Sequence, residues 1–96
     1  MVAYVIVDTK IHDVEAYEGY KKLARPIVEK FGGQYRVRGG DMEIVENELW
    51  EPTRIVVLEF KDMAAAKAML SAEEYIPVKA IRNAAAKCST IIIDGV

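Results

Sequence analysis

The sequence predicts an α+β domain, with one antiparallel sheet that carries its helices on a single face. Residues 54–60 form a short, nearly all-apolar run, which is typical of a strand covered on both faces. A similar run opens the chain, and stretches with helical spacing separate the expected strands. The order strand, helix, strand, strand, helix, strand fits a ferredoxin-like layout, and residues 1–96 suit a single domain.

The two faces of the strand at 54–60 differ, because side chains alternate along a strand. One face holds only apolar side chains, those of Val56, Leu58 and Phe60. The other face places a carboxylate among apolar side chains: Ile55, Val57 and Glu59. Helices can cover the first face, but little chain remains to cover the second, which would be left as an exposed apolar patch. We therefore expect a homodimer that packs sheet to sheet and buries on the order of 1,600 Å² or more.

The first third of the chain predicts a strand followed by a long helix. Residues 2–9 are continuous and β-branched, as expected for a central strand, and Asp13 is a good N-cap for the helix. The helix carries an apolar stripe with alternating steps of three and four residues, made of Tyr17, Tyr20, Ala24, Ile27 and Phe31. The pair Gly32-Gly33 then supplies a helix stop.

The middle of the chain predicts shorter strands. Residues 34–38 alternate polar and apolar side chains, with Tyr35 and Val37 on one face, which indicates a half-exposed or edge strand. Gly39-Gly40 predicts a turn or a bulge. Met42 to Glu46 predicts a second short strand, which either pairs back on the strand before it or continues that strand past a bulge. A loop that carries Trp50 follows it.

The last third predicts two helices and a final strand. Asp62 can cap an alanine-rich helix from Met63 to Leu70. Ser71 and Glu74 have the spacing of a capping box for a further helix, with a proline in or near its first turn. Residues 89–94, with three consecutive isoleucines, predict the last strand.

Composition excludes several classes of function. The formal net charge is −2 and no basic stripe stands out, which argues against a nucleic-acid partner. No apolar run is long enough to cross a bilayer, and the N-terminus lacks the basic segment of a signal peptide. Cys88 is the only cysteine, so the expected location is the reducing cytoplasm. No metal-ligand cluster, phosphate loop or dinucleotide fingerprint is present, so we expect no cofactor and no metal.

An ordered set of short motifs resembles a known family over essentially the whole chain. The motifs are Tyr4-Val5-Ile6, Asp13-Val14-Glu15-Ala16-Tyr17 with Tyr20, Gly32-Gly33, Arg38-Gly39-Gly40, Pro52-x-Arg54, Val57-Leu58-Glu59-Phe60, Ala65-Ala66, Ser71-x-x-x-Tyr75 and Arg82-x-x-Ala85. Together they resemble the domain-of-unknown-function 1330 family, within the dimeric α/β-barrel superfamily. The resemblance implies a ferredoxin-like homodimer but no established reaction. The superfamily includes haem-degrading and quinone-forming monooxygenases, whose specific ligands are not matched here.

Two polar groups are the first candidates for a site. Arg38 with Gly39 and Gly40 could hold an anion, because glycines expose backbone amides and a guanidinium can bind a carboxylate through two parallel hydrogen bonds. A turn with a solvated arginine explains the same residues and is favoured. Glu59 could act as a general base if burial raised its pKa. An ion pair with Arg38, Arg36 or an arginine of a second copy would instead keep it ionised.

Aromatic residues and the single histidine complete the candidates. Tyr17 and Tyr20 share the helix stripe, where core packing is more common than ligand contact. Trp50 could cover a pocket, or anchor its loop or a dimer. His12 could shuttle a proton, although an exposed loop histidine is the more common case.

The leading hypothesis is a small cytoplasmic homodimer that binds a small anionic or aromatic molecule in a cleft or barrel interior. Arg38, Glu59, Tyr17, Tyr20 and Trp50 are the expected lining. One alternative is a cofactor-free monooxygenase or isomerase in which Glu59 or His12 moves a proton. The other is a structural dimer module without a ligand. The sequence does not identify the ligand or decide whether the protein is an enzyme.

Overall fold

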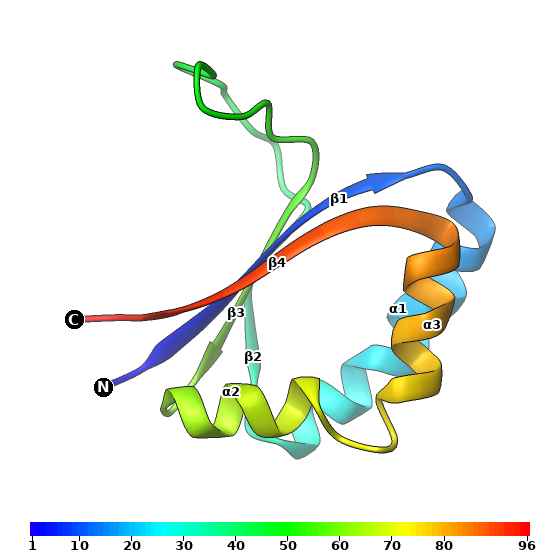
Figure 1. Ribbon diagram of the computed structural model, residues 1–96, viewed down its shortest axis with the longest axis vertical. Coiled ribbons are helices and arrows are strands. Elements are labelled where there is room, and N and C mark those ends of the chain that lie inside the picture. Colours follow the sequence, from blue (N-terminus) through cyan, green and yellow to red (C-terminus); the bar gives the residue numbers. More distant parts are fainter.

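The computed structural model describes all 96 residues and shows a four-stranded antiparallel sheet with three helices on one of its faces (Figure 1). This is the predicted ferredoxin-like α+β fold. The elements, in chain order, are β1 (Ala3–Ile11), α1 (Val14–Lys30), β2 (Gln34–Arg38), β3 (Ile55–Phe60), α2 (Met63–Leu70), α3 (Ile76–Ala85) and β4 (Ala86–Asp94). The strand order across the sheet is β2-β3-β1-β4, so the two most apolar strands are central.

The register gives the sheet two distinct faces. On β3, Val56, Leu58 and Phe60 are buried under the helices, while the residues between them are only half-buried, as the alternation predicted. The opposite face has no helix over it, and we call it the open face. Its middle row crosses all four strands and consists of apolar residues: Val37, Val57, Ile6 and Ile91.

Helix caps follow the sequence closely. The carboxylate of Asp13 accepts a hydrogen bond from the amide of Ala16 and so caps α1. Asp62 caps α2 in the same way. Gly32 ends α1 with a φ of 82°, a left-handed conformation that costs a glycine least.

Three local predictions were wrong. Tyr35 and Val37 lie on opposite faces, because a β-bulge between them shifts the register and breaks the alternation. Met42 to Glu46 forms no strand, since these residues lie in the long connection from β2 to β3. Ser71 does not begin a capping box: it ends α2, its hydroxyl donates to the carbonyl of Lys67, and α3 begins only at Ile76.

The connection over residues 39–54 projects away from the sheet at the end opposite α2 (Figure 1). Its base is fixed by Asp8 of β1, on the open face. One carboxylate oxygen accepts from the amides of Thr53 and Arg54 at 2.9 and 3.1 Å, and the other accepts from the Trp50 indole at 3.2 Å. Asp8 therefore fixes where β3 begins. No helix is long and apolar enough to cross a membrane.

Candidate functional site

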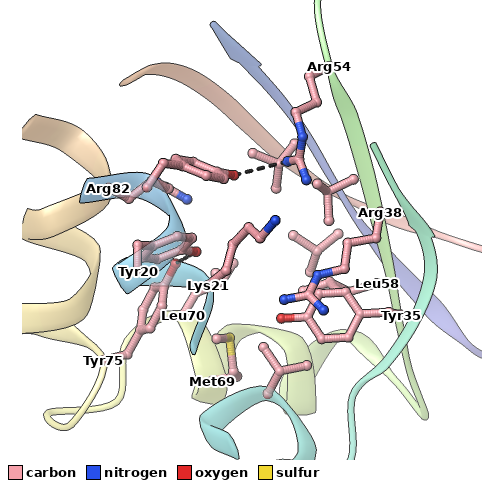
Figure 2. Close-up of a pocket in the computed structure, with 15 residues that line it drawn as sticks. Tyr20, Lys21, Tyr35, Arg38, Arg54, Leu58, Met69, Leu70, Tyr75 and Arg82 are labelled. Atoms are coloured by element: carbon pink, nitrogen blue, oxygen red, sulfur yellow. Dashed lines mark hydrogen bonds between the residues drawn. The ribbon is translucent and has the colours of Figure 1, made fainter. Parts of the chain in front are cut away.

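A cleft of about 40 Å³ lies between the helix-covered face of the sheet and the helices (Figure 2). That volume accommodates a few water molecules in the isolated chain. The apolar part of its lining comes from the two central strands and from the helices: Val5, Val7, Val28, Val56, Leu58, Met69 and Leu70. Four tyrosines add aromatic surface and hydroxyl groups: Tyr17, Tyr20, Tyr35 and Tyr75.

The remaining lining residues are all cationic. They are Lys21 of α1, Arg38 at the end of β2, Arg54 just before β3, and Arg82 of α3. No aspartate or glutamate lines the cleft. Figure 2 shows the Lys21 ammonium and the Arg38 and Arg54 guanidinium groups directed toward the same central space. The site therefore concentrates positive charge over an apolar floor.

Arg82 is the most unusual of the four. Only 7% of the residue is exposed, and its Nε has no hydrogen-bond partner. One terminal nitrogen donates to the side-chain oxygen of the adjacent Asn83 at 3.3 Å, and no carboxylate pairs with the guanidinium. A buried charge without a counter-ion is costly, so its presence at a cleft points to an anion as its partner.

Arg38 and Arg54 are held by aromatic rings. Arg54 donates to the hydroxyl of Tyr17 at 3.1 Å and lies 5.3 Å from the centre of that ring. Arg38 lies 4.7 Å from the ring centre of Tyr35. Such contacts orient a guanidinium without neutralising it, which leaves its charge available to a ligand.

Gly39 makes the position of Arg54 possible. Its φ is 70°, and a Cβ at this residue would stand 2.5 Å from the Arg54 Nε. Only glycine meets both the steric and the conformational requirement. A Cβ on Gly40 would meet nothing within 4 Å, so the requirement is specific to Gly39.

Three of the tyrosine hydroxyls in the cleft are neutral donors and acceptors. Tyr20 and Tyr75 share a hydrogen bond of 2.8 Å between their hydroxyl oxygens. Burial raises the pKa of Tyr20, Tyr35 and Tyr75 above that of a free phenol, so all three keep their protons at neutral pH. At the rim, Lys21 pairs with Glu18 at 2.9 Å, which lowers the pKa of that carboxyl group.

The structure brings together only part of the predicted site. Tyr17, Tyr20 and Arg38 line the cleft, and Gly39 packs beside it. Glu59 lies on the open face, where it pairs with Arg36 at 3.3 Å. Of the two partners within this chain that the sequence suggested for Glu59, the structure therefore selects Arg36 and not Arg38.

Trp50 and His12 lie outside the cleft as well. Trp50 reaches the open face through its bond to Asp8, and 57% of it is exposed. His12 is an exposed residue between β1 and α1, and only its backbone amide is bonded, to the carbonyl of Ala85. Neither side chain is placed to act on a molecule bound in the cleft.

Sequence reasoning missed Lys21, Arg54 and Arg82. Arg82 did carry a signal, because it is a charged residue within the apolar stripe of the last helix. Arg54 stands at the start of the apolar run of β3, a position that by itself indicates only a strand end. Lys21 gives no signal, since lysine is common on exposed helix faces.

Comparison with solved structures gives the same fold at low sequence identity. A protein of unknown function from Rhodopseudomonas palustris matches with a TM-score of 0.78 at 17% identity, over 99% of this chain and 82% of that chain. SnoaB, a cofactor-independent oxygenase from Streptomyces nogalater, matches with a TM-score of 0.74 at 9% identity, over 99% of this chain and 93% of SnoaB. A dimeric ferredoxin-like protein of unknown function from Jannaschia sp. CCS1 matches with a TM-score of 0.68 at 15% identity, over 99% of this chain and 100% of that chain.

No curated protein matches the sequence. The family model described as "Domain of unknown function (DUF1330)" matches residues 2–96, which is nearly the whole chain. The chain belongs to the DUF1330 family.

Proposed function

We propose that this protein binds a small anionic molecule with an apolar or aromatic body in the cleft between sheet and helices. The observation that carries the proposal is the composition of the cleft: every lining residue that is not hydrophobic is cationic, and none is acidic. The buried, unpaired guanidinium of Arg82 adds to it, because an anion would satisfy both its charge and its free Nε.

The cleft must widen to admit such a ligand, since its volume is well below that of ordinary ligand pockets. The rim can move without disturbing the core. Lys21 keeps 28% of its side chain exposed, and Arg38 is only half-buried at the end of an edge strand. Long basic side chains at a rim can swing outward at low cost.

Isothermal titration calorimetry with benzoate and its neutral analogue benzamide tests the proposal. We expect benzoate to bind and benzamide to bind at least about tenfold more weakly, because a charge-assisted hydrogen bond is worth ~1.5–3 kcal/mol. Arg38→Gln should weaken benzoate binding. Arg36→Gln is the matched control, because Arg36 lies two residues away and on the opposite face. Equal binding of the two probes, or equal effects of the two variants, would overturn the proposal.

We also propose that the protein is a homodimer that packs through the open face. The apolar row that includes Ile6 and Val57 crosses that face, and Ile91 and Ile93 are 55% and 49% exposed. The similar protein from Jannaschia sp. CCS1 is described as dimeric. Leaving this face in water would expose an extended apolar patch.

Sedimentation velocity at micromolar concentration tests the dimer. We expect the wild type to sediment as a dimer, and Ile6→Lys to sediment as a monomer because it places a charge in the middle of the apolar row. Lys21→Ala, on the helix side, should leave the dimer intact. A monomeric wild type would show that the open face is not an interface.

A cofactor-free oxygenase is a second candidate. One observation favours it: a cationic, acid-free cleft would stabilise a substrate in its anionic form. SnoaB, with the same fold, is described as a cofactor-independent oxygenase. Oxygen uptake with a panel of quinols tests this, and uptake no faster than in buffer by folded protein would count against it. The geometry gives no support to Glu59 or His12 as the base, since neither lines the cleft.

A further inference from the structure

The cleft holds more positive charge than one carboxylate can balance. Lys21 is paired with Glu18, but Arg38, Arg54 and Arg82 take part in none of the ion pairs of the structure. Three guanidinium groups therefore face the cleft without a carboxylate partner. A ligand with a single negative charge would leave two of them unbalanced, and the buried one cannot be screened by solvent.

The three guanidinium groups approach from different sides. Arg82 comes from α3 on the helix side, near the Tyr20–Tyr75 pair, while Arg38 and Arg54 come from the strand side (Figure 2). The apolar side chains of Leu58 and Met69 also line this space. The arrangement is thus a cationic group at one end, two cationic groups at the other, and apolar surface between them.

We propose that the ligand is a compact dicarboxylate, bound with one carboxylate on Arg82 and the other on Arg38 and Arg54. This inference rests on the proposed anion-binding function and specifies its ligand class. The buried Arg82 offers its free Nε–H to one carboxylate, which a guanidinium can hold by two parallel hydrogen bonds. The second carboxylate would bridge the two guanidinium groups that aromatic rings already hold in place, and would balance one of their two charges. Apolar surface suits the carbon body that joins the two ends.

A matched series of probes isolates the second charge. Isophthalate, its monomethyl ester and its dimethyl ester share one body and carry two, one and no negative charges at neutral pH. Glutarate and its two esters repeat the series with a flexible body. Calorimetry should show the diacid of at least one series binding about tenfold or more tighter than its monoester, which is the effect of one charge-assisted contact. The diester should bind most weakly.

Two variants test which arginines hold each carboxylate of the ligand. Arg82→Gln and Arg38→Gln should each reduce the preference for diacid over monoester to about threefold or less, because each removes a guanidinium group that holds one of the carboxylates. Arg36→Gln should keep the full preference, since that arginine lies on the open face. Thermal unfolding of each variant shows whether it is folded, so a loss of preference in a folded protein reports on the ligand contact.

The outcomes separate this inference from the function on which it rests. Monoesters that bind as tightly as their diacids in both series overturn the dicarboxylate proposal, while the anion-binding function stands. Benzoate binding without measurable binding of either diacid also overturns the dicarboxylate proposal alone. A diester that binds as tightly as its diacid overturns both proposals. A preserved diacid preference in folded Arg82→Gln overturns the assignment of one carboxylate to Arg82.

Discussion

Replacing Arg82 with methionine should stabilise the ligand-free protein while it weakens the binding of dianions. The residue is 7% exposed, its Nε has no partner, and no carboxylate balances its charge. Methionine keeps much of the apolar length of the side chain and adapts to irregular space. The variant thus removes the charge and leaves most of the packing in place.

The expected change in the free energy of unfolding combines one loss and one gain. The loss is the hydrogen bond from Arg82 to Asn83, at 3.3 Å, which is worth about 1 kcal/mol. The gain is relief from the burial of an unpaired ion, and replacing buried ions with apolar residues can stabilise a protein by ~1–4 kcal/mol. We expect a net gain of about 1–2 kcal/mol in the free energy of unfolding, or about 4 °C or more in the melting temperature.

Urea unfolding at one fixed protein concentration measures this change, because the stability of a dimer depends on concentration. Arg25→Met is the control: Arg25 pairs with Glu29 at 2.7 Å, but 59% of its side chain is exposed, so its loss should leave stability nearly unchanged. Isophthalate at one fixed concentration should stabilise the wild type more than Arg82→Met. A variant that is folded but clearly less stable than the wild type would refute the reasoning that Arg82 is an uncompensated charge.

Three further outcomes are expected. Gly39→Ala should lose about 1–2 kcal/mol of stability, because the φ of Gly39 is 70° and the new Cβ would clash with the Arg54 guanidinium. Gly40→Ala should lose less than about 1 kcal/mol, and equal losses of the two variants in urea unfolding would contradict this reasoning. Asp8→Ala should shift Trp50 fluorescence to longer wavelength, because the indole loses its carboxylate partner; an unchanged spectrum would show that the bond does not order the loop. Burial raises the pKa of Cys88, so iodoacetamide should alkylate this thiol in the folded protein more slowly than it alkylates glutathione at pH 8. The rate of alkylation should increase only at higher pH, and equal rates for the protein and glutathione at pH 8 would contradict the burial argument.

The elements that local chemistry determines were predictable from the sequence. Asp13 and Asp62 cap helices because a carboxylate can reach the free amides of its own first turn, which needs no tertiary information. The alternation along β3 predicted which side chains are buried, because a strand has a fixed period of two. Both rules act over a few residues, and both were confirmed.

Features that depend on tertiary contacts could not be predicted in this way. Ser71 and Glu74 have capping-box spacing, yet Ser71 caps the preceding helix instead, because its hydroxyl donates to the carbonyl of Lys67 in the last turn of α2. The short apolar stretch over 42–46 was predicted to form a strand but has no partner strand. Arg82 could be recognised as a charge in an apolar stripe, but only the fold shows that no carboxylate is near it.

The bulge in β2 explains why the candidate site was only partly predicted. Strict alternation would place Arg36 and Arg38 on one face, so both would compete for Glu59. The bulge between Tyr35 and Val37 leaves Arg36 on the open face, where it pairs with Glu59, but turns Arg38 to the helix side, where it has no carboxylate partner. One extra residue therefore separates an arginine in an ion pair from an arginine available to a ligand. Removing the bulge would take a guanidinium out of the cleft without changing any residue type, and so would reduce anion binding while the sheet is kept.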